Sequence, residues 1–145
     1  MTFPVISSEC LPHFFPSLRV KTALQLNVMF PNHPGTLARM SDMLRAADVN
    51  IEALFCSDGE KESVVHIIVD DVETAKMVMR ELVDVTTTEV LAFKVKNSPG
   101  AIAHVARMCA GAQINIRHLY ATSLGKEAMC YLAVDNVAKA KEALK

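Results

Sequence analysis

The stretch Asn32-His33-Pro34-Gly35, followed by Leu37, decides the fold because the chain repeats it as Asn97-Ser98-Pro99-Gly100, followed by Ile102. The offset of 65 residues holds without a gap over most of each copy. It also maps Ala38 onto Ala103, Met43 onto Met108, Asn50-Ile51 onto Asn115-Ile116, and Val69-Asp70 onto Val134-Asp135. The chain is therefore a duplicated module, and we expect its function to lie in what the two copies do together.

The size of one copy predicts that it does not stand alone. The chain has 145 residues, 51% of them hydrophobic, and a mean hydropathy of +0.24. A unit of about 65 residues buries only roughly 60% of its unfolded surface, so we expect each copy to dock against its twin or another chain. No apolar run approaches the roughly 18 residues of a membrane span. Segment 1–21 lacks the order of charged and apolar residues that marks a signal peptide.

Charge and side-chain chemistry exclude several classes of function. The 15 Lys and Arg residues are scattered among 16 acidic ones, so we expect no nucleic-acid partner. The four cysteines show no C-x-x-C spacing, which favours a reducing cytoplasm. The histidines lack metal-ligand spacing, and no Ser or Cys has the context of a nucleophile. We therefore expect no metal, no cofactor and no enzymatic activity.

Hydrophobic periodicity predicts the same elements in both copies. In the first copy, strands are expected over Leu24–Phe30, Val49–Cys56, Val64–Val69 and, more briefly, Val83–Thr87. One helix opens at Pro34-Gly35, and another is capped by Asp70 or Asp71. The residues expected to face inward from these helices are Leu37, Met40, Leu44, Ala47, Val72, Ala75, Met79 and Leu82. In the second copy they are Ile102, Val105, Cys109, Val137, Ala140 and Leu144.

The element order is βαββαβ followed by βαββα, which predicts an α+β fold of two ferredoxin-like units side by side. Each unit would have an antiparallel sheet with its helices on one face. We divide the chain into an N-terminal arm (1–21), a first unit (22–88) and a second unit (89–145) that lacks its last strand. The arm or another chain is expected to cover the edge left open. The face away from the helices is apolar enough to predict a second sheet against it, and hence a homodimer.

The repeated motif resembles the ACT domain over residues 22 to 145. The resemblance rests on Asn-x-Pro-Gly-x-Leu or Ile after the first strand and on Val-Asn-Ile or Ile-Asn-Ile at the second. Segments Glu89–Ala92 and Leu119–Ala121 are similar to those of stand-alone prokaryotic proteins that consist of two ACT units. The resemblance implies a small-molecule sensor, most often of amino acids, with the ligand at an interface between two units.

The candidate ligand site follows from the resemblance and from local chemistry. A helix N-terminus suits an α-carboxylate, and glycine lets backbone and ligand approach closely. The candidate residues are Asn32, His33, Pro34, Gly35, Thr36, Leu37 and Asn50, and in the second copy Asn97, Ser98, Pro99, Gly100, Ala101, Ile102 and Asn115. Phe30 and Val95 stand where serine-sensing domains carry a histidine, so a more apolar amino acid remains open as the ligand.

Simpler interpretations of the same residues remain open. The two loops can be strand-to-helix turns with no ligand, and Asn50 and Asn115 can bond only to nearby backbone. Arg117 replaces Glu52 in the repeat, and it is either a ligand contact or a solvated charge. Two functions therefore compete: a sensor of a free amino acid, and a ligand-free assembly module that docks on a partner enzyme of amino-acid biosynthesis.

Overall fold

The computed structural model describes residues 17–57 and 59–145, and these ranges hold six strands and four helices. In chain order they are β1 (Lys21–Pro31), α1 (Thr36–Ala46), β2 (Ile51–Ser57), β3 (Glu62–Val69), α2 (Val72–Met79), β4 (Val85–Lys96), α3 (Ala101–Gly111), β5 (Ile116–Leu124), β6 (Glu127–Val134) and α4 (Val137–Ala143). The predicted α+β class and the two ferredoxin-like units are confirmed.

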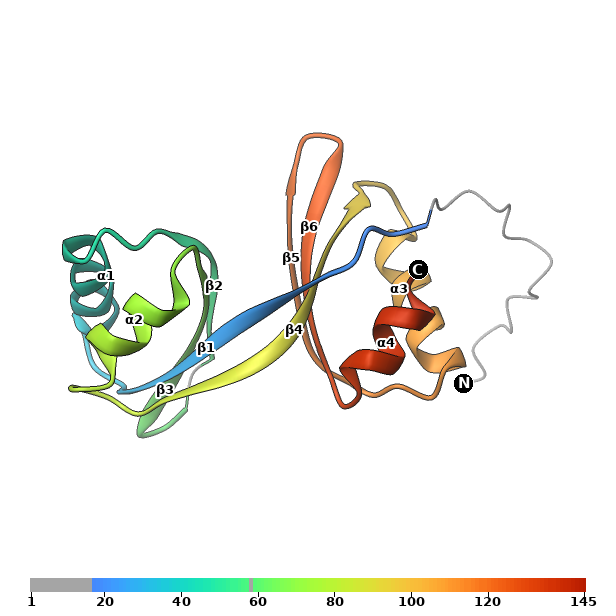
Figure 1. Ribbon diagram of the computed structural model, residues 1–145. Coiled ribbons are helices and arrows are strands. Elements are labelled where there is room, and N and C mark those ends of the chain that lie inside the picture. The colour runs from blue at the N-terminus through green and yellow to red at the C-terminus, as the bar shows by residue number, and fades with distance from the viewer. Residues whose placement is uncertain (1–16, 58) are drawn as a thin grey trace.

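All six strands belong to one antiparallel sheet with the order β2-β3-β1-β4-β6-β5. Strands β1 and β4 lie at its centre and run between the two helix pairs (Figure 1). Their register pairs Leu24 with Glu89, two residues that are also equivalent in the repeat. The two copies are therefore related by an approximate twofold axis that passes through this pair.

Each central strand serves both units. Separate strands were expected on either side of Thr88, but β4 runs without interruption through the predicted boundary between residues 88 and 89. The run Thr86–Thr88 contains no glycine or proline that would end a strand. At the other end of the β1–β4 ladder, Lys21–Leu24 pairs with Glu89–Ala92. This segment takes the place of the last strand that the second copy lacks.

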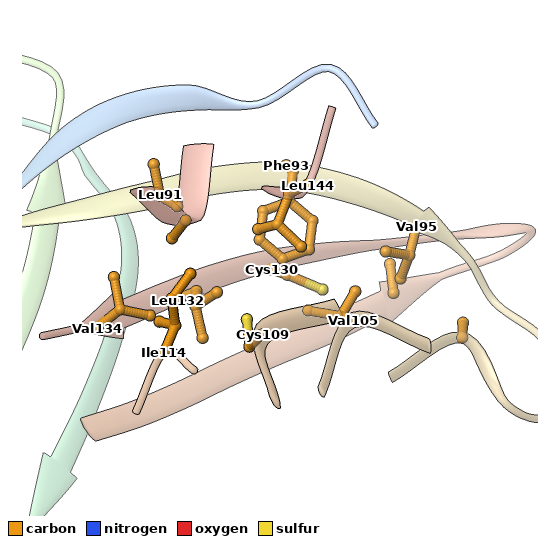
Figure 2. Close-up of a cluster of buried hydrophobic side chains, with 13 residues drawn as sticks. Leu91, Phe93, Val95, Val105, Cys109, Ile114, Cys130, Leu132, Val134 and Leu144 are labelled. Carbon is orange, nitrogen blue, oxygen red and sulfur yellow. The ribbon is translucent and has the colours of Figure 1, made fainter. Parts of the chain in front are cut away.

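Each helix pair covers its own core on the same face of the sheet. In the first unit, Leu26 and Val28 pack with Met40 and Leu44. In the second, the cluster around Phe93 joins β4 and β6 to α3 and α4 (Figure 2). Residues 17–20 border this second core, where Leu18 and Val20 are partly buried. The predicted arm continues into β1 at Lys21, and its residues 1–16 lie outside the described residues.

Three residues expected to face inward are exposed instead. Leu37 is 43% exposed and Ile102 is 39% exposed. Both lie in the first turn of a helix, where side chains lean toward the N-terminus and so past the end of the sheet. Leu82 is 55% exposed because α2 ends at Met79 and helical periodicity no longer sets its direction.

The face away from the helices is covered within the chain. Strands β2 and β5 are the two edges of the sheet, yet the rings of Phe55 on β2 and Tyr120 on β5 have centroids only 5.0 Å apart. Ile68, Tyr131 and Ala133 are buried in a small cluster beneath them. The second sheet expected here is thus the other half of the chain's own sheet, which is folded on itself. This face therefore gives no argument for a homodimer.

Candidate functional site

The two glycine loops have the geometry that the repeat predicts. Gly35 and Gly100 have φ values of 92° and 89°, in the left-handed region that glycine adopts without strain. Neither α1 nor α3 has a side-chain cap or an acidic residue in its first turn. By contrast, Asp71 caps α2 and Asn136 caps α4. The uncapped first turns keep amide groups and partial positive charge available to an anion.

Asn32 and Asn97 hold these loops in place. The side-chain amide of Asn32 donates to the Gly59 carbonyl oxygen at 3.0 Å, and that of Asn97 donates to the Gly125 carbonyl oxygen at 2.9 Å. Each bond ties a loop to the hairpin that follows the second strand of its own unit. The Thr36 hydroxyl adds a bond to the His33 carbonyl oxygen at 3.0 Å. These side chains therefore have a structural role in the loop.

Asn50 and Asn115 lie at the other end of the first helix of each unit. The backbone N–H of Asn50 donates to an Asp70 carboxylate oxygen at 2.9 Å, and the backbone N–H of Asp70 donates back to the backbone carbonyl oxygen of Asn50 at 3.2 Å. Asn115 and Asp135 repeat this pair. Helix α1 has 11 residues, a length of about 16 Å. One chain alone therefore does not bring Asn50 to the Gly35 loop.

The two loops are also far from each other. They follow the outer ends of β1 and β4, which run in opposite directions from the pair Leu24–Glu89. Seven residues separate Leu24 from Pro31, a distance of roughly 23 Å along a strand. The loops therefore lie at opposite ends of the molecule (Figure 1), and they do not form a joint site within one chain.

A cavity of about 370 Å³ lies at the first loop, and we call it the first cavity. His33, Pro34, Gly35 and Thr36 form one side of it. The other lining residues were not predicted from the sequence: Phe30, Pro31, Arg39, Met43, Met79, Leu82 and Val83. The sequence offered one signal for Arg39, its helical spacing, which places it one turn beyond Gly35. The backbone N–H of Arg39 donates to the Gly35 carbonyl oxygen at 3.0 Å.

A cavity of about 530 Å³, the second cavity, occupies the equivalent place in the other unit. The repeat offset relates residues that line the two cavities, which shows that they occupy the same place in the fold. The related pairs are Phe30 and Val95, Pro31 and Lys96, Thr36 and Ala101, Arg39 and His104, Leu82 and Ser17, and Val83 and Leu18. Of the residues predicted in the second loop, Ala101 lines this cavity.

A polar cluster that the sequence did not reveal joins the two units on the face without helices. We call Gln25 and the side chains around it the Gln25 cluster. Gln25 is fully buried. Its side-chain oxygen, Oε1, accepts from the Tyr120 hydroxyl at 2.9 Å and lies 3.1 Å from His118 Nε2. Its side-chain nitrogen, Nε2, donates to Asn27 Oδ1 at 2.7 Å and lies 3.1 Å from His66 Nδ1.

Burial shifts the pKa values of the ionisable side chains in the Gln25 cluster. It lowers the pKa of both His66 and His118, and the nearby His118 lowers that of His66 further. The same burial raises the pKa of Tyr120. The lowered pKa favours the neutral imidazole at both positions. His118 Nε2 faces the Gln25 side-chain oxygen, whereas His66 Nδ1 lies between the Gln25 amide nitrogen and Asn27 Oδ1 at 3.1 and 2.8 Å, so its tautomer decides whether it accepts from the first or donates to the second. The arrangement is that of a structural junction between the units.

Within 17–57 and 59–145, no group of three His, Cys, Asp or Glu side chains could hold a metal ion, and no helix is long and apolar enough to cross a membrane. Cys56, Cys109 and Cys130 are free thiols, and Cys109 and Cys130 are buried. Cys10 lies outside the described residues.

Fold and site together define a tandem of two ferredoxin-like units with a glycine loop before the first helix of each. The model of the ACT domain pair matches residues 21–145, so the chain belongs to that family, and the resemblance inferred from the motif is confirmed. No curated protein matches.

Solved structures share this fold. Protein BT0572 from Bacteroides thetaiotaomicron is 24% identical, with a TM-score of 0.82 over 86% of this chain and 88% of that one. The regulatory subunit of aspartate kinase from Thermus flavus is 11% identical, with a TM-score of 0.65 over 90% and 95%. Aspartate kinase from Clostridium acetobutylicum is 12% identical, with a TM-score of 0.57 over 86% of this chain and 33% of the kinase. At these identities the likeness concerns the fold alone.

Proposed function

We propose that this chain is a non-catalytic regulatory protein that binds a free amino acid in the first cavity. The observation that carries the proposal is the position of that cavity: it opens at the glycine loop and at the uncapped start of α1. Membership of the ACT domain pair family supports a regulatory role. The fold shared with aspartate kinase regulatory subunits supports it too.

The polar side of the first cavity suits the α-carboxylate of the ligand. The first turn of α1 offers backbone amides with no side-chain cap, and Arg39 adds a guanidinium group that can bind a carboxylate through two hydrogen bonds. His33 lies at the same side of the cavity. An amino acid bound here would direct its carboxylate toward Arg39 and Thr36.

The remaining wall suits an apolar side chain. Phe30 and Met79 are buried, Met43 is half-buried, and Leu82 and Val83 complete the wall. Flexible methionines adapt to ligands of different shape. The ligand we propose is therefore an amino acid with an apolar side chain, held by its carboxylate at the loop. Asn50 or Asn115 would contribute only from a second copy of the chain, in a homodimer.

The alternative is an assembly module that docks on a partner enzyme without a ligand. The observation in its favour is a pair of repeat-related apolar residues, Leu37 and Ile102, that are exposed beside the two loops. Each would offer an apolar contact to a docked partner at the same place in either unit. Copurification of a partner at the same yield with and without amino acids would favour this alternative.

A thermal-melt screen with the standard amino acids tests the proposal. A ligand at 100 times its Kd adds about 2.7 kcal/mol, which for a chain of this size raises the melting temperature by several degrees. Arg39→Ala should abolish the shift. Arg45→Ala is the matched control, because it removes the same charge from the other end of α1, where Arg45 pairs with Asp42 at 3.4 Å. The absence of a shift with every amino acid at millimolar concentration would contradict the proposal.

A further inference from the structure

The two cavities differ in how far the central ladder extends beside them. At the first cavity, β1 and β4 pair as far as Val28 and Val85, and the Met29 amide donates to the Asp84 carbonyl oxygen at 3.3 Å. At the second cavity the ladder ends one position earlier, at Lys21 and Ala92. The edge of β4 beyond Ala92 therefore faces residues 17–20 without strand pairing to them. The second cavity lies in this gap.

This gap reaches the face of the sheet without helices, where positive charge is concentrated. Because side chains alternate along a strand, Lys94 and Lys96 point away from the helices, whereas Phe93 and Val95 join the core beneath them. Lys21 and Arg19 line the cavity from the opposite side. Among the lining residues that the structure describes, Glu127 is the single carboxylate.

Glu127 compensates only part of this charge. Its carboxylate lies 3.4 Å from Lys94 Nζ. The charges of Arg19, Lys21 and Lys96 therefore have no partner of opposite sign among the described residues that line the cavity. The chain as a whole has a net charge of −1, so the concentration of cations here is a local feature.

This group of four cations has no counterpart in the other copy. The residues equivalent in the repeat to Arg19, Lys21, Lys94 and Lys96 are Asp84, Thr86, Met29 and Pro31. Four cations in one unit thus correspond to none in the other, although both cavities occupy the same place in the fold. The cavity is therefore present in both copies, but the charge of the residues that line it differs.

We propose that the second cavity binds a small dicarboxylate, with its two carboxylates held by Lys96 and by Arg19 and Lys21 across the gap. Charge complementarity supports this class of ligand, because two negative charges meet the three cations that Glu127 leaves uncompensated. The ligand class differs from the apolar amino acid of the first cavity. The inference adds a second site and does not depend on whether the first cavity is occupied.

Isothermal titration calorimetry of the full chain tests the inference, with succinate, aspartate and inorganic phosphate as probes. Arg19→Gln combined with Lys96→Gln should weaken dicarboxylate binding at least 10-fold. The matched control is Lys61→Gln combined with Lys139→Gln, which removes the same charge from exposed positions outside the cavity; it should change affinity less than 2-fold. Binding should also weaken as salt is added, because the cations are exposed.

Three results would overturn the inference: no dicarboxylate binding at millimolar concentration, equal loss in both double variants, or binding of phosphate alone. Tighter binding of aspartate than of succinate would support it and would indicate that the ammonium group of aspartate contacts the Glu127 carboxylate. Leucine titrated into the same proteins separates the two proposals. Its binding in the first cavity should be unchanged by Arg19→Gln with Lys96→Gln, so failure of one site leaves the other testable.

Discussion

The two ends of this molecule share a backbone and differ in chemistry. At the first end, strand pairing continues beside an apolar cavity with Arg39 at its polar side. At the second, the ladder stops one position earlier and leaves a gap lined by cations. The glycine loops are nearly identical, so they do not account for this difference. It lies in residues 17–21, which border the second end, and in the residues of β4 that they face.

The comparison also shows that the two ends are parts of one folded body. Strands β1 and β4 each complete both units, and the Gln25 cluster joins the outer halves of the sheet. Neither half has a complete sheet without the other. The following experiments test this comparison, beginning with the largest expected effect.

Truncation of the central strands should affect both halves at once. Leu26→Ala and Leu91→Ala remove repeat-related side chains that are fully buried in the first and second cores. Each should lower the free energy of unfolding by about 2–5 kcal/mol, and each protein should still unfold in a single transition. Urea unfolding followed by circular dichroism would measure this. Two separate transitions in either variant would show that the units fold independently.

Removal of the buried amide should weaken the junction between the halves. Gln25→Leu leaves the Tyr120 hydroxyl and His118 without the oxygen that they contact, at a cost of about 1–3 kcal/mol. Thr86→Val is the control, because it removes only a 3.2 Å bond from Asn27 at an exposed position. Unfolding free energies of the two variants that agree within error would show that the cluster contributes nothing to the junction.

Two glycine substitutions should have opposite signs. Gly35→Ala forces a side chain into a φ of 92° and should cost about 1 kcal/mol or more. Gly111→Ala lies at the last position of α3 with open space around it and should stabilise the protein by up to about 1 kcal/mol. Melting temperatures give both values. A Gly35→Ala protein as stable as the wild type would contradict a left-handed backbone conformation at this position.

The junction should also make stability depend on pH. Burial places the pKa of His66 and His118 below the ordinary value of 6.5, so the unfolded chain takes up protons first as the pH falls. Stability should therefore be constant above about pH 7 and should decrease as the pH falls through 6.5. His66→Gln with His118→Gln should flatten this part of the profile. If the double variant loses stability with falling pH as the wild type does, groups other than these two histidines cause the pH dependence.

The repeat and its periodicity predicted the fold well, since the motif at Gly35 and Gly100, the order of elements and most core positions follow from local patterns. Sharing of the central strands was missed because a strand boundary at Thr88 depends on which partner is paired, and pairing is not local. The Gln25 cluster was missed for the same reason: Gln25 is polar, and only closure of the sheet buries it. Of the residues that line the first cavity, those of the glycine loop belong to the motif, whereas Met79 and Val83 come from elements distant in sequence and carry no motif.

The account depends most on an amino acid entering the first cavity. Two-dimensional NMR of the backbone amides during titration with leucine and the other apolar amino acids would test this directly. We expect saturable shifts at Gly35, Thr36 and Arg39 together with Leu82 and Val83, which face the same cavity from the other side. Shifts confined to the region of Asn50 and Asp70, or none with any amino acid, would contradict the account.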